Sequence, residues 1–337
     1  MPSGVGHSMT PLISVILAVH NDERYIEESV RSVLEQTCED FELILVDDGS
    51  DDGTVSLVDS LARTDSRIRL FRQRRSGLTC SLIRATAEAR GLYLARQDSD
   101  DRSRSNRFAV QTNFLNTHPD IAAVGSDTVV IDQGGQRIKA IVGERGTGTI
   151  RSSLLSLRST PIHGSVMMRR ESVLAVGGYR LAFTVSQDFD LWLRLTEHCG
   201  LDNLSDILYE WRLNPVGVYS TRRMEQMMFS SIALAFTHER QLSGKDSYPL
   251  LEAAAGNIEY FLGEFHSSDK VHAQFGELLL RSGVKPELAR RHLARGLREG
   301  NITARALALF VWSVCRLPWP GIRPMTACKG ERSDLYG

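Results

Sequence analysis

Apolar runs alternate with amphipathic stretches over residues 13–124 of the chain. The runs are apolar at nearly every position, which is typical of strands buried on both faces of a parallel sheet. The expected strands cover residues 13–18, 41–46, 68–71, 92–96 and 121–124, and the expected helices cover residues 25–34, 55–63, 78–89 and 107–116. Strands and helices that alternate at this spacing predict an α/β fold, in which helices cover both faces of a mostly parallel sheet.

The pattern changes downstream of this region. Residues 126–220 mix short apolar runs with glycine-rich turns, and helical patterns dominate from residue 222 onward. These helical patterns cover residues 224–238, 250–265 and 286–298. Prolines and glycines gather after residue 317, as in poorly ordered tails. We therefore predict an α/β domain over residues 1–221, a helical domain over residues 222–317 and a flexible tail over residues 318–337.

Composition and charge narrow the class of protein. A hydrophobic content of 42% and a charged content of 24% are ordinary for a soluble globular protein. The formal net charge of -1 argues against a nucleic-acid partner, because such binding normally needs a basic excess. The five cysteines are widely spaced and form no CxxC motif, which favours free thiols and a cytoplasmic location.

One apolar segment, residues 304–317, bears on membrane contact. It is shorter than the ~20 residues that a helix needs to span a bilayer. Two interpretations stay open: a helix that packs on its own domain, or peripheral attachment at the inner face of a membrane.

Two acidic segments directly follow predicted strands. The first runs from Asp47 to Thr54, and the second runs from Asp98 to Asp101. In a parallel sheet the ligand site lies beyond the carboxyl ends of the strands. We therefore expect both segments at one edge of the sheet, although they are far apart in the sequence.

The two segments favour different chemistry. Asp47 and Asp48 can accept hydrogen bonds from a nucleobase or a ribose, although Asp, Ser and Gly also form ordinary turns. Asp98 and Asp100 stand at i and i+2, which suits Mn²⁺ or Mg²⁺ bound to a pyrophosphate; a solvated acidic turn is the alternative. A calcium loop of EF-hand type is excluded, because its bidentate glutamate position holds Ala109.

A third acidic position, Asp188, enters the apolar helical run SQDFDLWLRL at residues 186–195. It could act as a general base toward an acceptor hydroxyl. The alternative is a carboxylate stabilised by the positive end of the helix dipole.

Two other nucleotide-binding classes fit poorly. A dinucleotide oxidoreductase would carry GxGxxG after the first strand, and none occurs there. A nucleotidyltransferase or sugar-phosphate transferase would need a glycine-rich basic loop at residues 20–23, where the sequence is HNDE.

Several motifs of the sequence resemble those of one known family, the inverting family 2 glycosyltransferases. The Rossmann-like fold of this family is called GT-A. The matching stretches are residues 13–54 with LVDDGSDDGT, 95–126 with ARQDSDD, 163–180 with HGSVMM, and 186–195 with SQDFDLWLRL. They occur in the family's order and cover residues 13–220, about two-thirds of the chain. The resemblance implies a GT-A domain of the bacterial surface-glycan type and leaves the helical C-terminal region unexplained.

The resemblance also implies roles for individual residues. Ala18 and His20 would border the nucleobase, Asp48 would bind it with support from Asp47, and Asp98 would face the ribose or pyrophosphate. Asp100 would ligate the metal and Asp188 would be the catalytic base. The positions implied on the acceptor side or in support are Asp101, Gly178, Tyr179 and Trp192.

Three positions depart from the family's usual pattern. Ile83 stands where an asparagine is common, which removes one polar contact to the donor. Gln187 replaces a frequent acidic residue before Asp188, and Ser105 replaces a proline without an expected effect.

These roles imply a metal-dependent transfer of a sugar from a nucleotide-diphosphate sugar, with a UDP-sugar favoured, to an acceptor hydroxyl. The acceptor would be a glycan, a lipid-linked molecule or a protein in cell-surface polysaccharide synthesis. The alternative is an inactive GT-A domain that serves as a binding or scaffold protein in a glycan-assembly complex.

Overall fold

The computed structural model describes residues 10–258 except 159–160 and 215–220, together with residues 260, 261, 290, 291, 293 and 294. The chain divides into two compact units, Met1–Arg223 and Met224–Gly337. The expected apolar segment 304–317 and the expected tail 318–337 lie outside the described residues, as does most of the expected helix 286–298.

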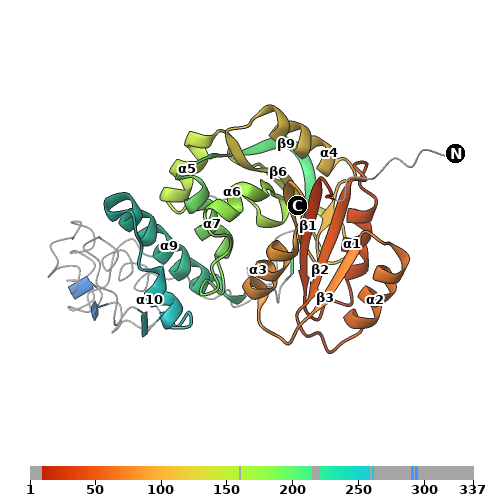
Figure 1. Ribbon diagram of the computed structural model, residues 1–337, viewed down its shortest axis with the longest axis horizontal. Coiled ribbons are helices and arrows are strands. Elements are labelled where there is room, and N and C mark those ends of the chain that lie inside the picture. Colours follow the sequence, from red (N-terminus) through yellow and green to blue (C-terminus); the bar gives the residue numbers. More distant parts are fainter. Residues whose placement is uncertain are drawn as a thin grey trace, which may run out of the picture. The chain divides into compact units, whose positions relative to one another are not determined.

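One mixed sheet forms the centre of the first unit (Figure 1). Its strands are β1 (Ile13–Val19), β2 (Phe41–Asp47), β3 (Ile68–Arg72), β4 (Tyr93–Asp98), β5 (Arg102–Ser103), β6 (Ile121–Ile131), β7 (Arg137–Ile141), β8 (Met167–Arg169) and β9 (Gly200–Arg212). Their order is β3-β2-β1-β4-β8-β6-β9-β5, and β7 pairs with β6. The pairs β1–β2, β1–β4, β2–β3 and β6–β9 are parallel, whereas β8 runs antiparallel to both neighbours.

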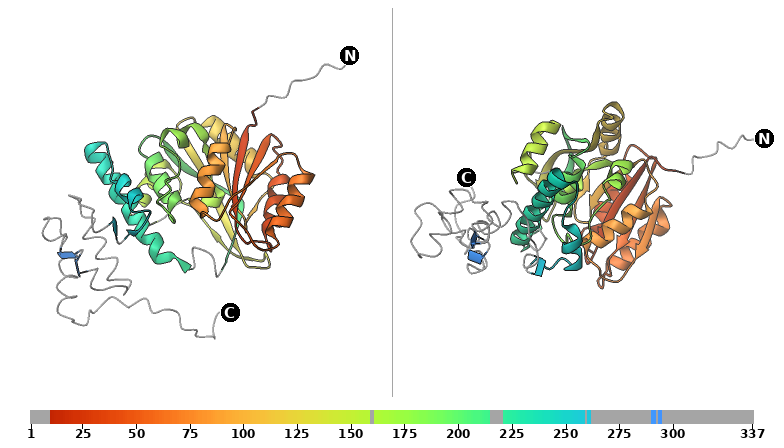
Figure 2. Two further views of the ribbon diagram at one scale, coloured as in Figure 1. Left: turned by 60° about the horizontal axis from the view of Figure 1, so that its bottom comes forward. Right: turned by 60° about the vertical axis from the view of Figure 1, so that its left-hand side comes forward.

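Helices connect these strands. They are α1 (Ile26–Leu34), α2 (Thr54–Thr64), α3 (Leu78–Glu88), α4 (Arg107–Thr117), α5 (Thr147–Leu155), the short 3-10 helix η1 (His163–Ser165), α6 (Arg170–Ala175) and α7 (Gln187–Leu195). Helices α1 and α2 lie on one face of β1–β3 and α3 lies on the other (Figures 1 and 2). Right-handed crossovers require this arrangement, because the chain moves outward from β1 to β3 and then back to β4. The predicted α/β fold is confirmed.

Alternation along β1 separates the two faces. Ile13, Val15 and Leu17 are fully buried and belong to the core cluster formed with α1, α2 and α4. On α1, Val30 and Val33 supply the matching apolar face. This packing favours the register of β1, since a slip by one residue would turn Ile13, Val15 and Leu17 away from α1, α2 and α4.

The strand order reverses next to β1. Strands β2 and β3 follow on one side and β4 lies on the other. In the register, Ala18 pairs with Asp98, and Val19 pairs with Asp47. The ends of β1, β2 and β4 therefore meet at one edge, which is where ligands of open α/β sheets bind.

The second unit is helical where it is described. Its helices are α9 (Arg223–Ser243) and α10 (Tyr248–Ala253). The rings of Phe236 and Phe261 pack edge to face, 5.9 Å apart. Within the described residues of the whole chain, no helix combines the length and the apolar character that crossing a membrane requires.

Candidate functional site

Asp48 is held by the segment that follows β3. Its Oδ1 accepts hydrogen bonds from Nε2 of Gln73 and the backbone N–H of Ser76, both at 2.8 Å. Its Oδ2 accepts one from the backbone N–H of Gly77 at 2.8 Å. A carboxylate offers about four acceptor positions. One position on Oδ2 is therefore left for a ligand.

His20 and Asp47 flank this carboxylate. The ring Nδ1 of His20 lies 3.0 Å from the backbone oxygen of Asp48, and its buried Nε2 has no hydrogen-bond partner among the described residues. Asp47 is buried, and its Oδ1 accepts a hydrogen bond from the N–H of Ser50 at 3.1 Å. Asp47 thus shapes the turn, while His20 presents a polar ring atom beside Asp48.

Hydrogen bonds join the loop after β1 to the loop after β2. Asn21 donates from Nδ2 to Oδ1 of Asp51 at 2.6 Å, and its Oδ1 accepts from the N–H of Asp51 at 2.9 Å. Oε2 of Glu23 accepts from the N–H of Gly53 at 2.6 Å. Asn21 has a φ of 50°, a conformation that asparagine tolerates better than most residues.

Asp98 is the last residue of β4, and Arg96 and Tyr209 hold it in place by hydrogen bonds. Arg96 is fully buried and donates from Nη2 to Oδ1 of Asp98 at 2.5 Å. The N–H of Asp98 donates to the hydroxyl of Tyr209 at 3.1 Å. A Cβ added at Gly164 would lie 2.6 Å from Oδ2 of Asp98, so η1 approaches the carboxylate as closely as only glycine allows. Ala18, the β-sheet partner of Asp98, is buried beside it.

Carboxylates crowd around Asp100. Burial and the charge of Asp98 raise the pKa of Asp100. Its Oδ2 accepts a hydrogen bond from Nδ2 of Asn214 at 3.3 Å. Burial raises the pKa of Asp22 to about 7, and the negative charge of Asp100 adds to the increase. A hydrogen bond with the side chain of Ser99 lowers this pKa but does not offset the increase. Negative groups that repel one another in this way are the usual surroundings of a bound cation.

The donor set suits a hard divalent cation that is shared with a ligand. Asp98 and Asp100 supply carboxylate oxygens, which Mg²⁺ and Mn²⁺ prefer. In the described part of the chain no group of three or more His, Cys, Asp or Glu side chains could hold a metal ion by itself. Mg²⁺ commonly binds through one or two carboxylates together with substrate phosphates, and the residues present fit that mode.

Asp101 points into the protein. It is 1% exposed, and its Oδ1 accepts a hydrogen bond from the N–H of Arg212 at 2.7 Å. Burial raises its pKa well above the usual range, with further contributions from Asp100 and Asp98. These contacts give Asp101 a supporting position in the acidic segment.

Asp188 lies in the first turn of α7. Burial raises its pKa to about 6, against the hydrogen bonds from the N–H groups of Phe189 and of Asp188 itself, which lower it. The neighbouring Asp190 is fully buried and forms an ion pair with Arg194 at 2.6 Å. Of the two acidic residues in this turn, Asp190 is therefore structural, while Asp188 has the pKa of a general base near neutrality.

A neutral polar cluster lies close to Asp188. Nε2 of His163 is 2.8 Å from the hydroxyl of Tyr179, and the ring of Trp192 lies 5.9 Å from that of His163. Burial lowers the pKa of His163 well below its usual range and raises that of Tyr179, whose pKa the charge of Asp188 raises further. Trp192 is fully buried, and its Nε1 has no hydrogen-bond partner in the described part of the chain.

Gly178 lies directly before Tyr179 of this cluster in the chain. Its φ of 66° lies in the left-handed region that favours glycine, and its carbonyl accepts a hydrogen bond from Nη2 of Arg194 at 2.7 Å. The turn that Gly178 forms leads directly into Tyr179.

Sequence reasoning missed four contributors to this site. Asp22 stood in the acidic turn after β1, and its position at the sheet edge could have identified it. His163 opened the matching stretch HGSVMM but received no role. Arg96 stood in the matching stretch ARQDSDD but received no role, and nothing in the sequence distinguishes Arg212 from the other arginines.

Comparisons with known proteins agree with the resemblance. The family model described as glycosyl transferase family 2 matches residues 14–177. The putative glycosyltransferase EpsE of Bacillus subtilis is 36% identical over 208 residues, which are 60% of this chain and 73% of EpsE. The O-antigen biosynthesis glycosyltransferase WbnJ of Escherichia coli is 30% identical over 207 residues, 60% of this chain and 80% of WbnJ.

Solved structures share the fold. TarS of S. aureus in complex with UDP-GlcNAc has a TM-score of 0.60 at 15% identity, covering 89% of this chain and 90% of the TarS chain. The mannosyltransferase PcManGT of Pyrobaculum calidifontis, in complex with GDP-Man and Mn²⁺, has a TM-score of 0.54 at 19% identity, covering 91% and 80%. The predicted GT-A fold is thereby confirmed, and the chain belongs to glycosyltransferase family 2.

Proposed function

We propose that this glycosyltransferase moves a sugar from a UDP-sugar to an acceptor hydroxyl by a metal-dependent, inverting displacement. One observation carries the proposal. Three carboxylates with different surroundings lie around Asp98: Asp48 with its hydrogen-bonded loop follows a nearby strand end, and Asp98 acts by its charge on both Asp100 and Asp188, whose pKa is about 6. These surroundings suit a nucleobase, a cation and a proton, respectively.

The hydrogen bonds of Asp48 favour uracil over guanine. Uracil presents one N–H on its pairing edge, whereas guanine presents two adjacent donors that would need both carboxylate oxygens. Oδ1 already accepts two hydrogen bonds, and Oδ2 accepts one. One remaining acceptor position matches a single N–H and leaves the second guanine donor unpaired, which is costly in a buried site.

The proposed cation is Mn²⁺ or Mg²⁺. Asp98 and Asp100 would hold it together with the diphosphate, and when bound it would neutralise the charge that develops on the leaving group. The Mn²⁺ in the PcManGT complex supports a divalent cation, since that protein has the same fold.

Asp188 supplies the proposed proton chemistry. Its carboxylate takes the proton of the acceptor O–H, and the oxygen forms a bond to the anomeric carbon while the bond from that carbon to the diphosphate breaks. UDP leaves from the opposite face, so the configuration inverts. His163 and Tyr179 are neutral near pH 7, as their shifted pKa values indicate, and can hold sugar hydroxyls by hydrogen bonds.

The acceptor is proposed to be a glycan, a lipid-linked molecule or a protein in surface-polysaccharide synthesis. The O-antigen role in the name of WbnJ supports this class. A cytoplasmic enzyme with peripheral membrane contact through residues 304–317 would meet such acceptors, and that contact is part of the proposal.

A donor panel tests the proposal. The protein is incubated with UDP-, GDP- and dTDP-sugars, with and without Mn²⁺ or Mg²⁺, and nucleotide release is measured. We expect cation-dependent release from a UDP-sugar and much less from GDP-sugars. Equal release with EDTA would contradict the metal role. Nucleotide binding without any turnover, across donors and simple sugar acceptors, would favour the scaffold alternative.

A further inference from the structure

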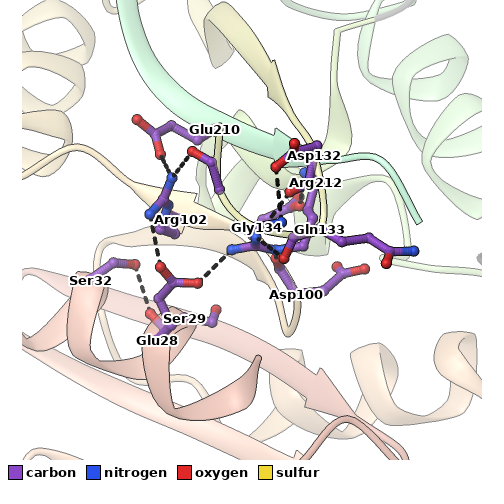
Figure 3. A network of polar contacts seen from close by, with 12 residues as sticks. Glu28, Ser29, Ser32, Asp100, Arg102, Asp132, Gln133, Gly134, Glu210 and Arg212 are labelled. Atoms are coloured by element: carbon purple, nitrogen blue, oxygen red, sulfur yellow. Dashed lines mark hydrogen bonds and ion pairs between the residues drawn. The ribbon is translucent and has the colours of Figure 1, made fainter. Parts of the chain in front are cut away.

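Arg212 ends β9, and its guanidinium contacts three separate segments of the chain (Figure 3). Nε donates to the backbone oxygen of Asp100 at 2.7 Å, and Nη1 donates to the backbone oxygens of Asp132 and Gln133, both at 3.2 Å. Nη2 pairs with Oε2 of Glu28 at 2.5 Å. The side chain of Arg212 is 2% exposed, so these contacts replace the water that the buried charge has lost.

The main chain of Arg212 holds the same acidic segment. Its N–H donates to Oδ1 of Asp101 at 2.7 Å. The guanidinium also lies over the ring of Tyr25, 4.4 Å from the ring centre. One residue therefore anchors the acidic segment twice, at the carbonyl of Asp100 and at the carboxylate of Asp101.

Glu28 pairs with Arg212 and also with Arg102, the residue that follows Asp101. Its Oε1 pairs with Nη1 of Arg102 at 2.8 Å, and Nη2 of Arg102 pairs with Glu210 at 2.7 Å (Figure 3). Both ends of the stretch from Asp100 to Arg102 are thus tied to α1 through a single carboxylate.

We infer that Arg212 is a positioning residue for the cation site: it fixes the backbone at Asp100 so that this carboxylate stays beside Asp98. The inference rests on the proposed function, which assigns Asp100 to a cation. Lysine at this position would keep the charge. Its single ammonium, however, cannot replace the planar fork that reaches two backbone segments and Glu28 at once.

A Mn²⁺ titration tests the inference. Mn²⁺ is added to the full-length protein with UDP, and bound Mn²⁺ is measured by electron paramagnetic resonance. For Arg212→Lys we expect the Mn²⁺ concentration at half saturation to rise about tenfold, as for other residues that orient metal ligands. UDP binding in EDTA should stay at the wild-type value. Arg104→Lys is the matched control, because Arg104 pairs with Glu210 in the same network, and it should keep the wild-type midpoint.

The possible results separate this inference from the proposed function. An Arg212→Lys protein that is less stable but keeps the wild-type Mn²⁺ midpoint overturns the inference and leaves the function standing. If that variant does not fold, Glu28→Gln decides: a smaller rise in the midpoint supports the inference, and an unchanged midpoint overturns it. A wild-type protein that takes up no Mn²⁺ with UDP overturns both.

Discussion

Aspartates of the site differ in their protonation because their surroundings differ. Asp22 and Asp188 are desolvated, and burial raises their pKa values to about 7 and about 6. Asp52 accepts hydrogen bonds from the N–H groups of Thr54 and Glu23, and these help to lower its pKa against the opposing effect of burial. The same residue type can therefore serve as a base, a charge near a cation, or a turn former.

For Asp188 we expect a large loss of turnover on substitution. Asp188→Asn keeps the shape but cannot take a proton, so kcat should fall about 10³-fold, within the usual range for general bases. UDP binding with Mn²⁺ should not change. In the wild type, donor turnover should fall as the pH drops below about 6, because protonated Asp188 is inactive. Stopped assays from pH 5 to 8 measure this; full turnover by the variant would exclude the base role.

Because the pKa of Asp22 is raised, we expect the free energy of unfolding to depend on pH. The folded protein keeps the Asp22 proton up to about pH 7, whereas the unfolded chain releases it near pH 3.8. The stability contribution of Asp22 therefore falls as the pH rises from about 4 to about 7. Asp22→Asn should stabilise the protein at pH 8 by about 2 kcal/mol, roughly half of the full shift at ~1.4 kcal/mol per unit.

Urea unfolding in EDTA at pH 8 and pH 4 measures this difference. The gain should vanish at pH 4, where Asp22 is protonated in the folded state. Asp52→Asn is the control and should give no gain at pH 8, because the pKa of Asp52 is lowered. A gain of equal size at both pH values would show that charge burial is not its cause.

At the scale of elements, the sequence predicts some strands much better than others. The strands β1 to β4 lie within two residues of the prediction, because βαβ units bury apolar runs on both faces. The expected strand at 121–124 is only the start of β6, which runs to Ile131. β9 was missed, since its exposed residues Ser205, Asp206 and Ile207 interrupt any apolar run.

The residues of the candidate site also differ in how far the sequence pointed to them. Motif spacing led to Asp48, Asp98, Asp100 and Asp188, because each stands directly after a strand or at a helix start. Arg212 could not be predicted, since its contacts with Asp132 and Gln133 arise from the pairing of β9 with β6, about 80 residues apart in the chain. Long-range sheet pairing is not encoded in local periodicity.

The short helix η1 gives an element-scale prediction. A Cβ at Gly164 would lie 2.2 Å from the hydroxyl of Tyr209 and 2.6 Å from Asp98, so Gly164→Ala must displace one of them. We expect a loss of about 1–3 kcal/mol in unfolding free energy and weaker binding of UDP with Mn²⁺. Gly148→Ala in α5 is the control, because no atom lies within 4 Å of its added Cβ.

Urea unfolding and calorimetry compare these two glycine variants. Gly148→Ala should leave both quantities unchanged or raise stability slightly. Equal behaviour of the two variants would mean that η1 does not need to approach Asp98 closely.

At the scale of the whole molecule, every proposed site residue belongs to the first unit, Met1–Arg223. In the proposed function, the ends of β1, β2 and β4 bind the donor, and α7 and η1 face the acceptor. The family match, residues 14–177, ends before Asp188 and Arg212. The proposed base and the proposed positioning residue therefore come from the part of the unit that the family model does not cover.

Binding of UDP tests the central claim most directly. Unfolding temperatures are measured for the wild type and for Asp100→Asn, with UDP in Mn²⁺ and in EDTA. At a UDP concentration of about 100 times Kd, binding stabilises a protein by ~2.7 kcal/mol, which corresponds to roughly 5–10 °C for a domain of this size. The proposed metal site predicts that full shift only for the wild type with Mn²⁺, and a smaller shift in EDTA or in Asp100→Asn. No shift under any condition, or the same shift in EDTA and in Asp100→Asn, would contradict it.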